Sequence, residues 1–357
     1  MNTTVSKITI VGAGGGGSAC AVGLRLRGFD VSLFSRNLAS RPRLGKNREI
    51  EYRGDLGDGI ISVNATDNIR DAIHEAELIL VIVPAFAQSD IASLLFEHVK
   101  RKQIIVFAPG ACASLECRLL LQRIEVVGEL LTIPYGGRIQ SNEILDVSAP
   151  MLERGKVMRT ASFPGSEIGK IVDTLKGVLE TKQASNVVET GILNPSSITH
   201  PSIMLFNLGS FERKDPNFSE LNDGLTSASS NLIEDLDSEK MNVCKSLNVA
   251  SPSIAEVFGE FASRRLYTEK ERSLTTSEKV YSVQRRFVEE DVPFGLVLIS
   301  SLAKLANTKT PLIDSAVRIF SSALNVDLIS TGRNLKSMGV SGLSVDQLSF
   351  MLNNGPR

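Results

Sequence analysis

The sequence predicts an α/β protein, with a doubly wound parallel sheet in the N-terminal half and a mostly α-helical C-terminal half. Before about residue 190, short apolar runs alternate with amphipathic segments, as in a parallel sheet covered on both faces. After that point, apolar residues recur with a helical period of about 3.6 residues. A chain of 357 residues usually exceeds one hydrophobic core. We therefore expect two domains, residues 1–190 and 191–357.

Five strands are expected in the first half, each a short and nearly continuous apolar run. They are Lys7–Val11, Asp30–Phe34, Glu77–Val83, Gln103–Ala108 and Ile124–Leu131. Amphipathic segments between the strands predict helices at Ser18–Arg27, Asn68–Glu75 and Ser89–Val99. Arg48–Val63 interrupts this alternation. Its β-prone pieces are split by glycines, which predicts an inserted hairpin.

The second half is expected to consist of helices. Helical periodicity covers Leu221–Leu247, Ile254–Lys270 and Phe294–Ala306. Ser344 and Gln347 have the spacing of a capping box, and Gly355 is placed to end the helix that follows it. We expect the domain boundary in a loop around Glu189–Pro201, because the two prolines of that stretch disfavour helix.

The composition excludes several classes of protein. With 42% hydrophobic and 22% charged residues, the chain resembles a globular protein rather than a disordered, collagen-like or membrane protein. The net charge of -1 gives no electrostatic reason to expect nucleic acid or a membrane as a partner. The longest apolar run, Leu78–Ala87, is too short to span a bilayer.

The N-terminus and the cysteines indicate the compartment. The first residues lack the basic region, apolar stretch and small-residue cleavage site of a secretory signal. The four cysteines, Cys20, Cys112, Cys117 and Cys244, fit neither a metal-ligand spacing nor a disulfide framework. We therefore expect a cytoplasmic protein without a metal centre.

A glycine-rich turn follows the first expected strand. It consists of Gly12, Ala13, Gly14, Gly15, Gly16 and Gly17. Gly12, Gly14 and Gly17 occupy the G-x-G-x-x-G positions, which serve a tight turn, backbone approach to a pyrophosphate, and helix–strand packing. The next helix would present free N–H groups to the phosphates. Between a strand and a helix, this turn predicts a Rossmann-type dinucleotide-binding domain rather than a glycine-rich surface loop.

The residues after the second expected strand bear on the choice of cofactor. An NAD-selective site usually has Asp or Glu there to bind the ribose 2′-hydroxyl, whereas arginine accommodates a 2′-phosphate. This chain has Ser35 and Arg36 instead. A basic cluster of Arg41, Arg43, Lys46 and Arg48 follows. The alternative is a solvated basic loop, but Arg36 favours NADP(H) as the cofactor, with NAD(H) as the second choice.

Three histidines are candidates for acid–base catalysis near neutral pH. His74 and His98 lie near the C-terminal ends of expected helices, where a cation complements the helix dipole, so we expect both at the surface. His200 lies in Asn194–Pro201, at the expected domain junction, where ligand sites often form. By position alone, His200 fits a functional role and a structural role equally well.

The segment Arg285–Pro293 has the mixed charges and final proline of a solvated helix end. A resemblance gives it further significance. The motifs that carry the resemblance are the glycine-rich turn, Asn194 with His200-Pro201, Arg286 with Asp291-Val292, and Leu328–Arg333. Together they resemble the opine dehydrogenase family, and within it the bacterial octopine synthase type, over essentially the whole chain. The resemblance implies an NAD(P)H-dependent reductive condensation of an amino acid with a 2-oxo acid, often pyruvate.

Roles for individual residues also follow from the resemblance. His200 would be the catalytic acid–base, Asp291 the carboxylate that orients it, and Arg286 the anchor of a substrate carboxylate. Glu129 matches a glutamate of the family's substrate pocket. Asn194 and Gln88 complete the implied substrate site, and Val83 and Pro84 the implied nicotinamide site.

Two other functions remain open. One is a ketopantoate-reductase-like or 2-hydroxyacid reductase, which would reduce a C=O bond directly. Ketopantoate reductases depend on a lysine at the junction, and no lysine lies between Gln183 and Arg213. The other is a non-catalytic NADP-binding protein, which would not need His200, Arg286 and Asp291 together. The amino acid, the oxo acid and the oligomeric state, a homo-oligomer included, are not fixed by the sequence.

Overall fold

The computed structural model describes residues 5–150, 155–213, 218, 223–261 and 285–355. Within it the chain divides into two compact units. The first unit comprises Met1–Thr190 together with Met351–Arg357, and the second comprises Gly191–Phe350. The helix α6 (Val187–Ile192) and the helix α15 (Val345–Asn354) each cross from one unit to the other.

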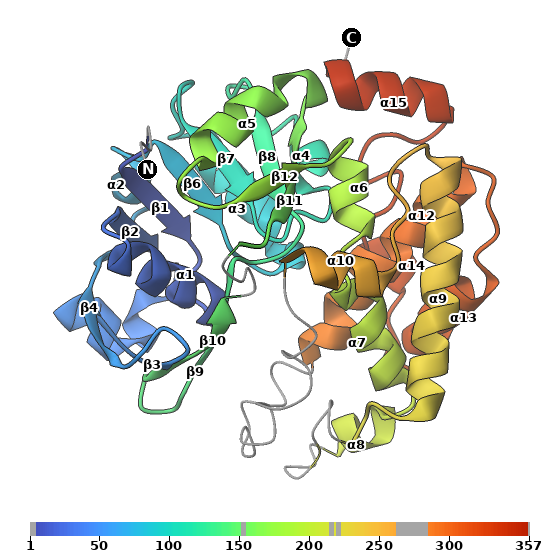
Figure 1. Ribbon diagram of the computed structural model, residues 1–357, viewed down its shortest axis with the longest axis horizontal. Helices are drawn as coiled ribbons and strands as arrows, with labels where there is room; N and C mark the ends of the chain where they lie inside the picture. The colour runs from blue at the N-terminus through green and yellow to red at the C-terminus, as the bar shows by residue number, and fades with distance from the viewer. Residues whose placement is uncertain (1–4, 151–154, 214–217, 219–222, 262–284, 356–357) are drawn as a thin grey trace. The chain divides into compact units, whose positions relative to one another are not determined.

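An eight-stranded sheet forms the centre of the first unit (Figure 1). In spatial order its strands are β12 (Thr181–Gln183), β11 (Met158–Phe163), β8 (Val127–Leu130), β7 (Ile104–Phe107), β6 (Leu78–Val81), β1 (Lys7–Val11), β2 (Asp30–Phe34) and β5 (Asn64–Thr66). The five expected strands are all present. The sheet departs from an all-parallel one in a single pairing among these strands, because β11 runs antiparallel to β8.

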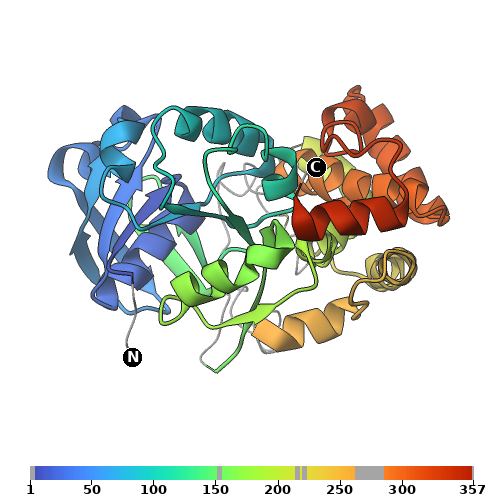
Figure 2. The same ribbon diagram turned by 90° about the horizontal axis from the view of Figure 1, so that it is seen from above.

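Helices cover both faces of this sheet (Figure 2). They are α1 (Gly15–Leu26), α2 (Ile69–Ile73), α3 (Gln88–Phe96), α4 (Ala113–Glu116) and α5 (Ile168–Leu175). On one face α2, α3 and α4 share a buried apolar cluster with β6, β7 and β8. On the other face, Gly17 of α1 packs near Ile10, and Ile171 of α5 lies against Gly128. The doubly wound arrangement expected from the sequence is therefore confirmed.

A second, four-stranded sheet lies beside α1. Its order is β4 (Gly59–Ser62), β3 (Glu49–Gly54), β10 (Leu145–Pro150) and β9 (Tyr135–Ile139). The antiparallel pair β3 and β4 confirms the hairpin expected in Arg48–Val63. The strands β9 and β10 were not expected from the sequence. They extend the hairpin into a sheet, and β9 packs along α1 through contacts of Gly137 with Gly15 and of Tyr135 with Gly23.

The described part of the second unit is helical. Its main helices are α7 (Ser196–Leu205), α8 (Leu208–Glu212), α9 (Ser227–Ser246), α10 (Ile254–Phe261), α12 (Val297–Leu305), α13 (Pro311–Leu324) and α14 (Leu328–Thr331). Helices were expected where α9, α10 and α12 lie, although residues 221–222 and 262–270 of the expected segments are outside the described residues. The capping box is also confirmed, since the N–H of Ser344 donates to Gln347 and the N–H of Gln347 donates to the Ser344 hydroxyl.

The loop expected around Glu189–Pro201 was wrong, because α6 and α7 occupy most of it. Pro195 lies at the N-cap of α7, where its missing N–H removes no helical bond. Pro201 lies inside α7. Most of α7 is buried, and burial of a helix face outweighs the unfavourable propensity of one proline.

Candidate active site

The glycine-rich turn joins β1 to α1. Gly12 has φ +118°, and a Cβ there would overlap the carbonyl oxygen of Ile82, so only glycine fits. A Cβ on Gly17 would overlap the carbonyl oxygen of Gly12, which is the close helix–strand packing of the fingerprint. A Cβ on Gly14 would have no heavy atom of the described residues within 4 Å. That free space fits the approach of a pyrophosphate to the backbone, so these residues suit a dinucleotide.

The two glycines between those positions have another role. A Cβ on Gly15 would overlap the carbonyl oxygen of Gly137 in β9, and one on Gly16 would lie 3.1 Å from Ile133 Cδ1. These glycines therefore let the second sheet pack closely against α1. Only part of the glycine run is available to a cofactor, through its side facing away from β9.

The other residues expected at the cofactor lie at the same edge of the sheet. Val83 follows β6, and its Cγ1 would lie 2.9 Å from a Cβ on Gly12. Pro84 comes next and leads into a short 3₁₀ turn. Ser35 and Arg36 follow β2, where the Ser35 N–H donates to the Thr66 carbonyl. The strand order reverses between β1 and β6, which is where α/β sheets bind nucleotides.

In the second unit, His200 and Asp291 form a hydrogen-bonded pair. His200 Nδ1 lies 2.9 Å from Asp291 Oδ2. The side chains are 22% and 16% exposed, so both are mostly buried but not sealed. Burial raises the pKa of Asp291 above its usual value, and Glu290 acts in the same direction, while His200 and Arg286 oppose the increase. A carboxylate on Nδ1 leaves Nε2 as the ring nitrogen available to a substrate.

The ring of Phe287 stacks on the imidazole of His200. The ring centroids are 3.7 Å apart and the planes differ by 23°. With Asp291 at one ring nitrogen and Phe287 against one ring face, the orientation of the imidazole is fixed by two independent contacts. Phe287 was not among the residues expected at the site. The sequence offered one indication of its role, because Phe287 lies four residues before Asp291 and so shares a helix face with it.

A π-helical turn, Val292–Leu296, holds Asp291 against α7. Pro293 does not end the helix, because the helical chain continues through this turn into α12. The N–H of Arg333 donates to the Pro293 carbonyl over 2.9 Å. The approach requires Gly332, since a Cβ there would overlap that carbonyl oxygen. Single π-turns inserted in α-helices are frequent at functional sites.

Arg333 itself is fully buried, with its guanidinium 5.2 Å from the centre of the Phe294 ring. Arg333 thus contacts the π-helical turn twice, through its side chain at Phe294 and through its backbone N–H at Pro293. The Leu328–Arg333 motif therefore packs against the turn that follows Asp291, and it stabilises the position of that residue of the dyad.

Models of known families match two parts of the chain. Residues 7–131 match the N-terminus of NAD-dependent glycerol-3-phosphate dehydrogenase. Residues 183–324, which include His200 and Asp291, match the α-helical domain of NAD/NADP octopine/nopaline dehydrogenase. An opine dehydrogenase of Arthrobacter sp. (strain 1C) is 29% identical over 94% of this chain and 95% of its own. Its helical domain thus matches the octopine/nopaline dehydrogenases, and the chain is similar to an opine dehydrogenase over nearly its whole length.

Solved structures of opine dehydrogenases have the same fold. Octopine dehydrogenase with NADH and L-arginine superposes with a TM-score of 0.69, at 17% identity, over 98% of each chain. Yersinopine dehydrogenase with NADP+ bound superposes with a TM-score of 0.65, at 14% identity, again over 98% of each chain. At such identities these likenesses establish the fold alone.

Two residues that the opine dehydrogenase resemblance placed near the substrate are buried in the first unit. Gln88 donates from Nε2 to the Pro109 carbonyl over 2.8 Å. Glu129 accepts from the N–H and hydroxyl of Ser114, both at 2.7 Å, and from the N–H of Cys112 at 3.1 Å. These bonds engage both Glu129 oxygens, so the carboxylate also fixes the start of α4.

Asn194 and Arg286, expected at the substrate in an opine dehydrogenase, belong to the second unit. Asn194 accepts the N–H of Ser196 through its side-chain oxygen at the entry to α7. Arg286 donates from Nε to Glu290 over 2.6 Å, and its side chain is 51% exposed while that of Glu290 is 9% exposed. Arg286 is thus a half-exposed cation five residues before Asp291 in the sequence.

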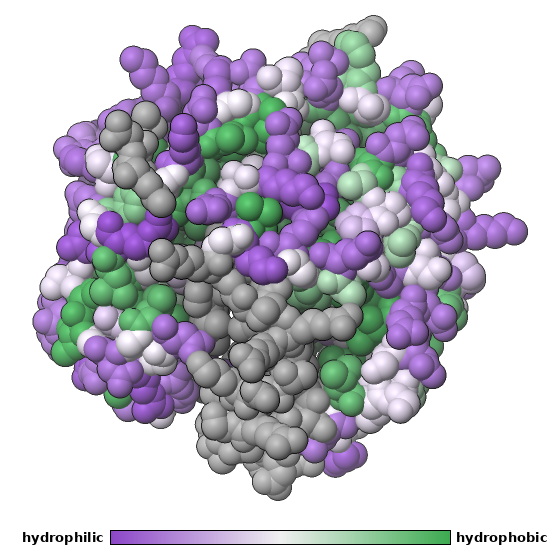
Figure 3. Space-filling model, in the orientation of Figure 1, coloured by the Kyte–Doolittle hydropathy of each residue, from purple (hydrophilic) through white to green (hydrophobic). Residues whose placement is uncertain are grey.

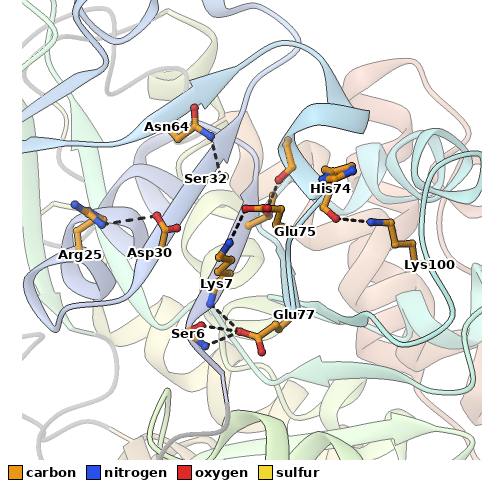
Figure 4. A network of polar contacts seen from close by, with 12 residues as sticks. Ser6, Lys7, Arg25, Asp30, Ser32, Asn64, His74, Glu75, Glu77 and Lys100 are labelled. Carbon is orange, nitrogen blue, oxygen red and sulfur yellow. Dashed lines mark hydrogen bonds and ion pairs between the residues drawn. The ribbon is translucent and has the colours of Figure 1, made fainter.

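His74 and His98 belong to the first unit, whereas the His200–Asp291 dyad belongs to the second. Figure 4 places His74 in a polar network with Lys7, Glu75 and Lys100. The Lys100 ammonium donates to the His74 carbonyl, and a shallow pocket is lined by this region. It lies at the amino ends of the parallel strands, opposite the edge where nucleotides bind. The network therefore joins strands and is no candidate for catalysis.

Three further observations concern the described residues as a whole. None of their helices combines the length and apolarity needed to cross a membrane. Hydrophilic side chains predominate among them on the face drawn in Figure 3. They also contain no group of three or more His, Cys, Asp or Glu side chains arranged to hold a metal ion.

Proposed function

We propose that this chain is an opine synthase, which joins the amino group of an amino acid to the carbonyl carbon of a 2-oxo acid and reduces the resulting imine with NAD(P)H. Pyruvate is our favoured oxo acid, and the product is an N-(carboxyalkyl) amino acid. The observation that carries the proposal is the hydrogen bond between His200 and Asp291, within the domain that matches the octopine/nopaline dehydrogenases.

His200 acts as the acid–base. With Nδ1–H donating to Asp291, the Nε2 lone pair accepts a proton from the substrate ammonium group, which makes the amine nucleophilic. The carboxylate of Asp291 stabilises the imidazolium that forms. After the amine has added to the carbonyl carbon and one of its protons has passed to the oxyanion, His200 returns its own proton to the hydroxyl group of the carbinolamine, which leaves as water and gives the protonated imine. Both proton transfers use one nitrogen atom, so the ring does not have to reorient.

The carboxylates of the substrates need cationic partners. Arg286 suits this role because its planar guanidinium can form two parallel hydrogen bonds to a carboxylate. We propose that a substrate carboxylate shares Arg286 with Glu290. Asn194 remains a proposed contact through its side-chain amide. For Glu129 and Gln88, we propose an indirect contribution to the pocket, through the loops they fix.

The cofactor site comprises the glycine-rich turn with Ser35, Arg36, Val83 and Pro84. A bound nicotinamide dinucleotide supplies the hydride that reduces the imine. The N–H groups at the start of α1 would hold its pyrophosphate. We propose a preference for NADP(H), because Arg36 occupies the position where an NAD-selective site has an acidic residue. The Arg36 side chain is 59% exposed, and its distance of 4.0 Å from Asp90 makes only a weak ion pair.

We further propose two functional domains, residues 1–190 for the dinucleotide and 191–357 for the helical catalytic part. We place the enzyme in the cytoplasm. All four of its cysteines are buried as thiols, and that usage is typical of a reducing compartment.

A spectrophotometric screen tests the proposed function. NADPH or NADH is mixed with pyruvate or 2-oxoglutarate and with each of the twenty amino acids in turn, and the loss of absorbance is followed. We expect oxidation only when both an oxo acid and a suitable amino acid are present. Oxidation with an oxo acid alone would identify a ketopantoate-reductase-like or 2-hydroxyacid reductase. No oxidation with any pair, despite cofactor binding, would favour a non-catalytic binding protein.

A further inference from the structure

Arg41 lies against the glycine-rich turn. Its Nη1 donates to the carbonyl oxygen of Ala13 over 2.6 Å and to the hydroxyl of Ser18 over 2.9 Å. Ala13 is the second residue of the fingerprint, and Ser18 belongs to the first turns of α1. The chain after β2 therefore folds back to place a guanidinium beside the proposed phosphate site.

The neighbouring cations are placed differently. Arg43 forms an ion pair with Glu51. Arg48 donates to the Ala65 carbonyl. Arg36 is exposed, with Asp90 at 4.0 Å. Among the described hydrogen bonds and ion pairs of this basic cluster, those of Arg41 thus join it to the glycine-rich turn and to the start of α1.

The electrostatic surroundings of Arg41 are unfavourable without an anion. The N-terminus of α1 carries a partial positive charge, so a cation beside it is repelled. Burial lowers the pKa of Arg41, and Glu143 opposes this at longer range. No described carboxylate forms an ion pair with Arg41. Its Nε atom is buried and has no hydrogen-bond partner among the described residues.

The geometry of the guanidinium fits a phosphate. Nη1 uses both of its hydrogens on Ala13 and Ser18, which fixes the plane of the group. Nη2 and Nε remain for an acceptor, and together they form the side of the fork that binds phosphate oxygens in pairs. An anion in this position would also accept N–H groups from the start of α1.

We propose that Arg41 binds a phosphate group of the dinucleotide and is a cofactor-binding residue in addition to the glycine-rich turn. The inference rests on the proposed use of a nicotinamide dinucleotide. Two phosphates have the required chemistry, the pyrophosphate common to both cofactors and the 2′-phosphate of NADP(H).

Arg41→Gln tests the proposal, with Arg43→Gln as the matched control. Dissociation constants are measured by titration calorimetry for NADPH, NADH, ADP-ribose and 2′-phospho-ADP-ribose, without amino acid or oxo acid. Losing a charge-assisted pair of hydrogen bonds should weaken binding by about 10- to 100-fold. A pyrophosphate contact predicts equal weakening for all four ligands. A 2′-phosphate contact predicts weakening of NADPH and 2′-phospho-ADP-ribose alone.

The control and a second variant distinguish a lost phosphate contact from a loss of structure. Arg43→Gln should stay within about threefold of wild type, because Arg43 is paired with Glu51. Arg41→Lys keeps the positive charge but loses the planar fork of the guanidinium. Its affinity for the ligands should therefore lie between that of wild type and that of Arg41→Gln. Unchanged affinities in Arg41→Gln, or equal losses in both glutamine variants, would overturn the proposal. Since no substrate is present, these outcomes are independent of whether opine synthesis occurs.

Discussion

Gly295 and Ser197 touch at the point where the π-helical turn meets α7. A Cβ on Gly295 would lie 2.5 Å from the Cβ of Ser197, closer than real side chains approach. Ser197 is one helical turn before His200, and Gly295 is one turn after Asp291. The missing methyl group is therefore what allows the two backbones, and with them His200 and Asp291, to come together.

Gly295→Ala should push α7 away from the π-helical turn. We expect a loss of about 1–3 kcal/mol in the free energy of unfolding, as in overpacked cores, and a fall in kcat because the His200–Asp291 bond lengthens. Gly169→Ala is the control, since a Cβ there would have no described heavy atom within 4 Å. Denaturant unfolding and steady-state kinetics measure both effects. Equal behaviour of the two variants would contradict this explanation.

His200→Ala should reduce turnover by about 10²- to 10⁴-fold, the usual contribution of a positioned acid–base. Asp291→Asn should act in the same direction, because an amide neither fixes the required tautomer nor stabilises the imidazolium. NADPH affinity should be nearly unchanged, since the glycine-rich turn belongs to the other unit. Kinetics and calorimetry check this, with His98→Ala as the control. A wild-type rate in His200→Ala would remove the basis of the proposed chemistry.

Arg36→Asp should reverse the preference between cofactors. Aspartate repels a 2′-phosphate and accepts hydrogen bonds from a ribose 2′-hydroxyl, so kcat/KM should fall for NADPH and rise for NADH. The ratio of the two constants is the measurement. If the wild-type enzyme already prefers NADH, the interpretation of Ser35 and Arg36 is wrong.

The carboxylate of Glu77 links β1 to the start of β6 (Figure 4). It accepts the N–H groups of Ser6 and Lys7 at 2.7 and 2.9 Å. Burial alone would raise the pKa of Glu77, but these bonds outweigh it and hold the pKa below its usual value. The stabilisation is then complete above the ordinary pKa of glutamate, about 4.3, and is lost as the pH falls through the lower pKa of the folded state.

Glu77→Gln should accordingly be less stable than wild type at pH 7, and the difference should shrink toward pH 3. Urea unfolding at a series of pH values gives both free energies. Exposed Glu97→Gln, whose neighbour His98 is 4.0 Å away, serves for comparison. A gap between wild type and Glu77→Gln that stays constant with pH would exclude the linkage.

Much of the fold could be predicted because its central strands are simple in sequence. The expected strands Lys7–Val11 and Asp30–Phe34 have the same bounds in the structure, since buried parallel strands are continuous apolar runs. Tyr135–Ile139 gave no such signal. It contains two glycines and an arginine, and it is a strand because α1 and β10 pack against it.

The pairing of His200 with Asp291 was predictable from the sequence, whereas the packing around this pair was not. The resemblance named His200 and Asp291, and the structure brings them together. Phe287 and Gly295 were missed because stacking and backbone approach depend on which helices meet, which no local pattern records. Arg41 was noted only as part of a basic cluster, and its bonds to the turn required the fold.

The packing of β9 against α1 also limits how the cofactor preference can be redesigned. Gly15 and Gly16 lie in a run that looks uniformly tolerant, yet any side chain at Gly15 would collide with the second sheet. Arg36 is exposed and can be varied, whereas the open space beside Gly14 is the space proposed for the pyrophosphate. A library for altered coenzyme choice should therefore diversify Arg36 and leave Gly14 and Gly15 unchanged, because a side chain at Gly14 would fill the space proposed for the pyrophosphate and one at Gly15 would collide with the second sheet.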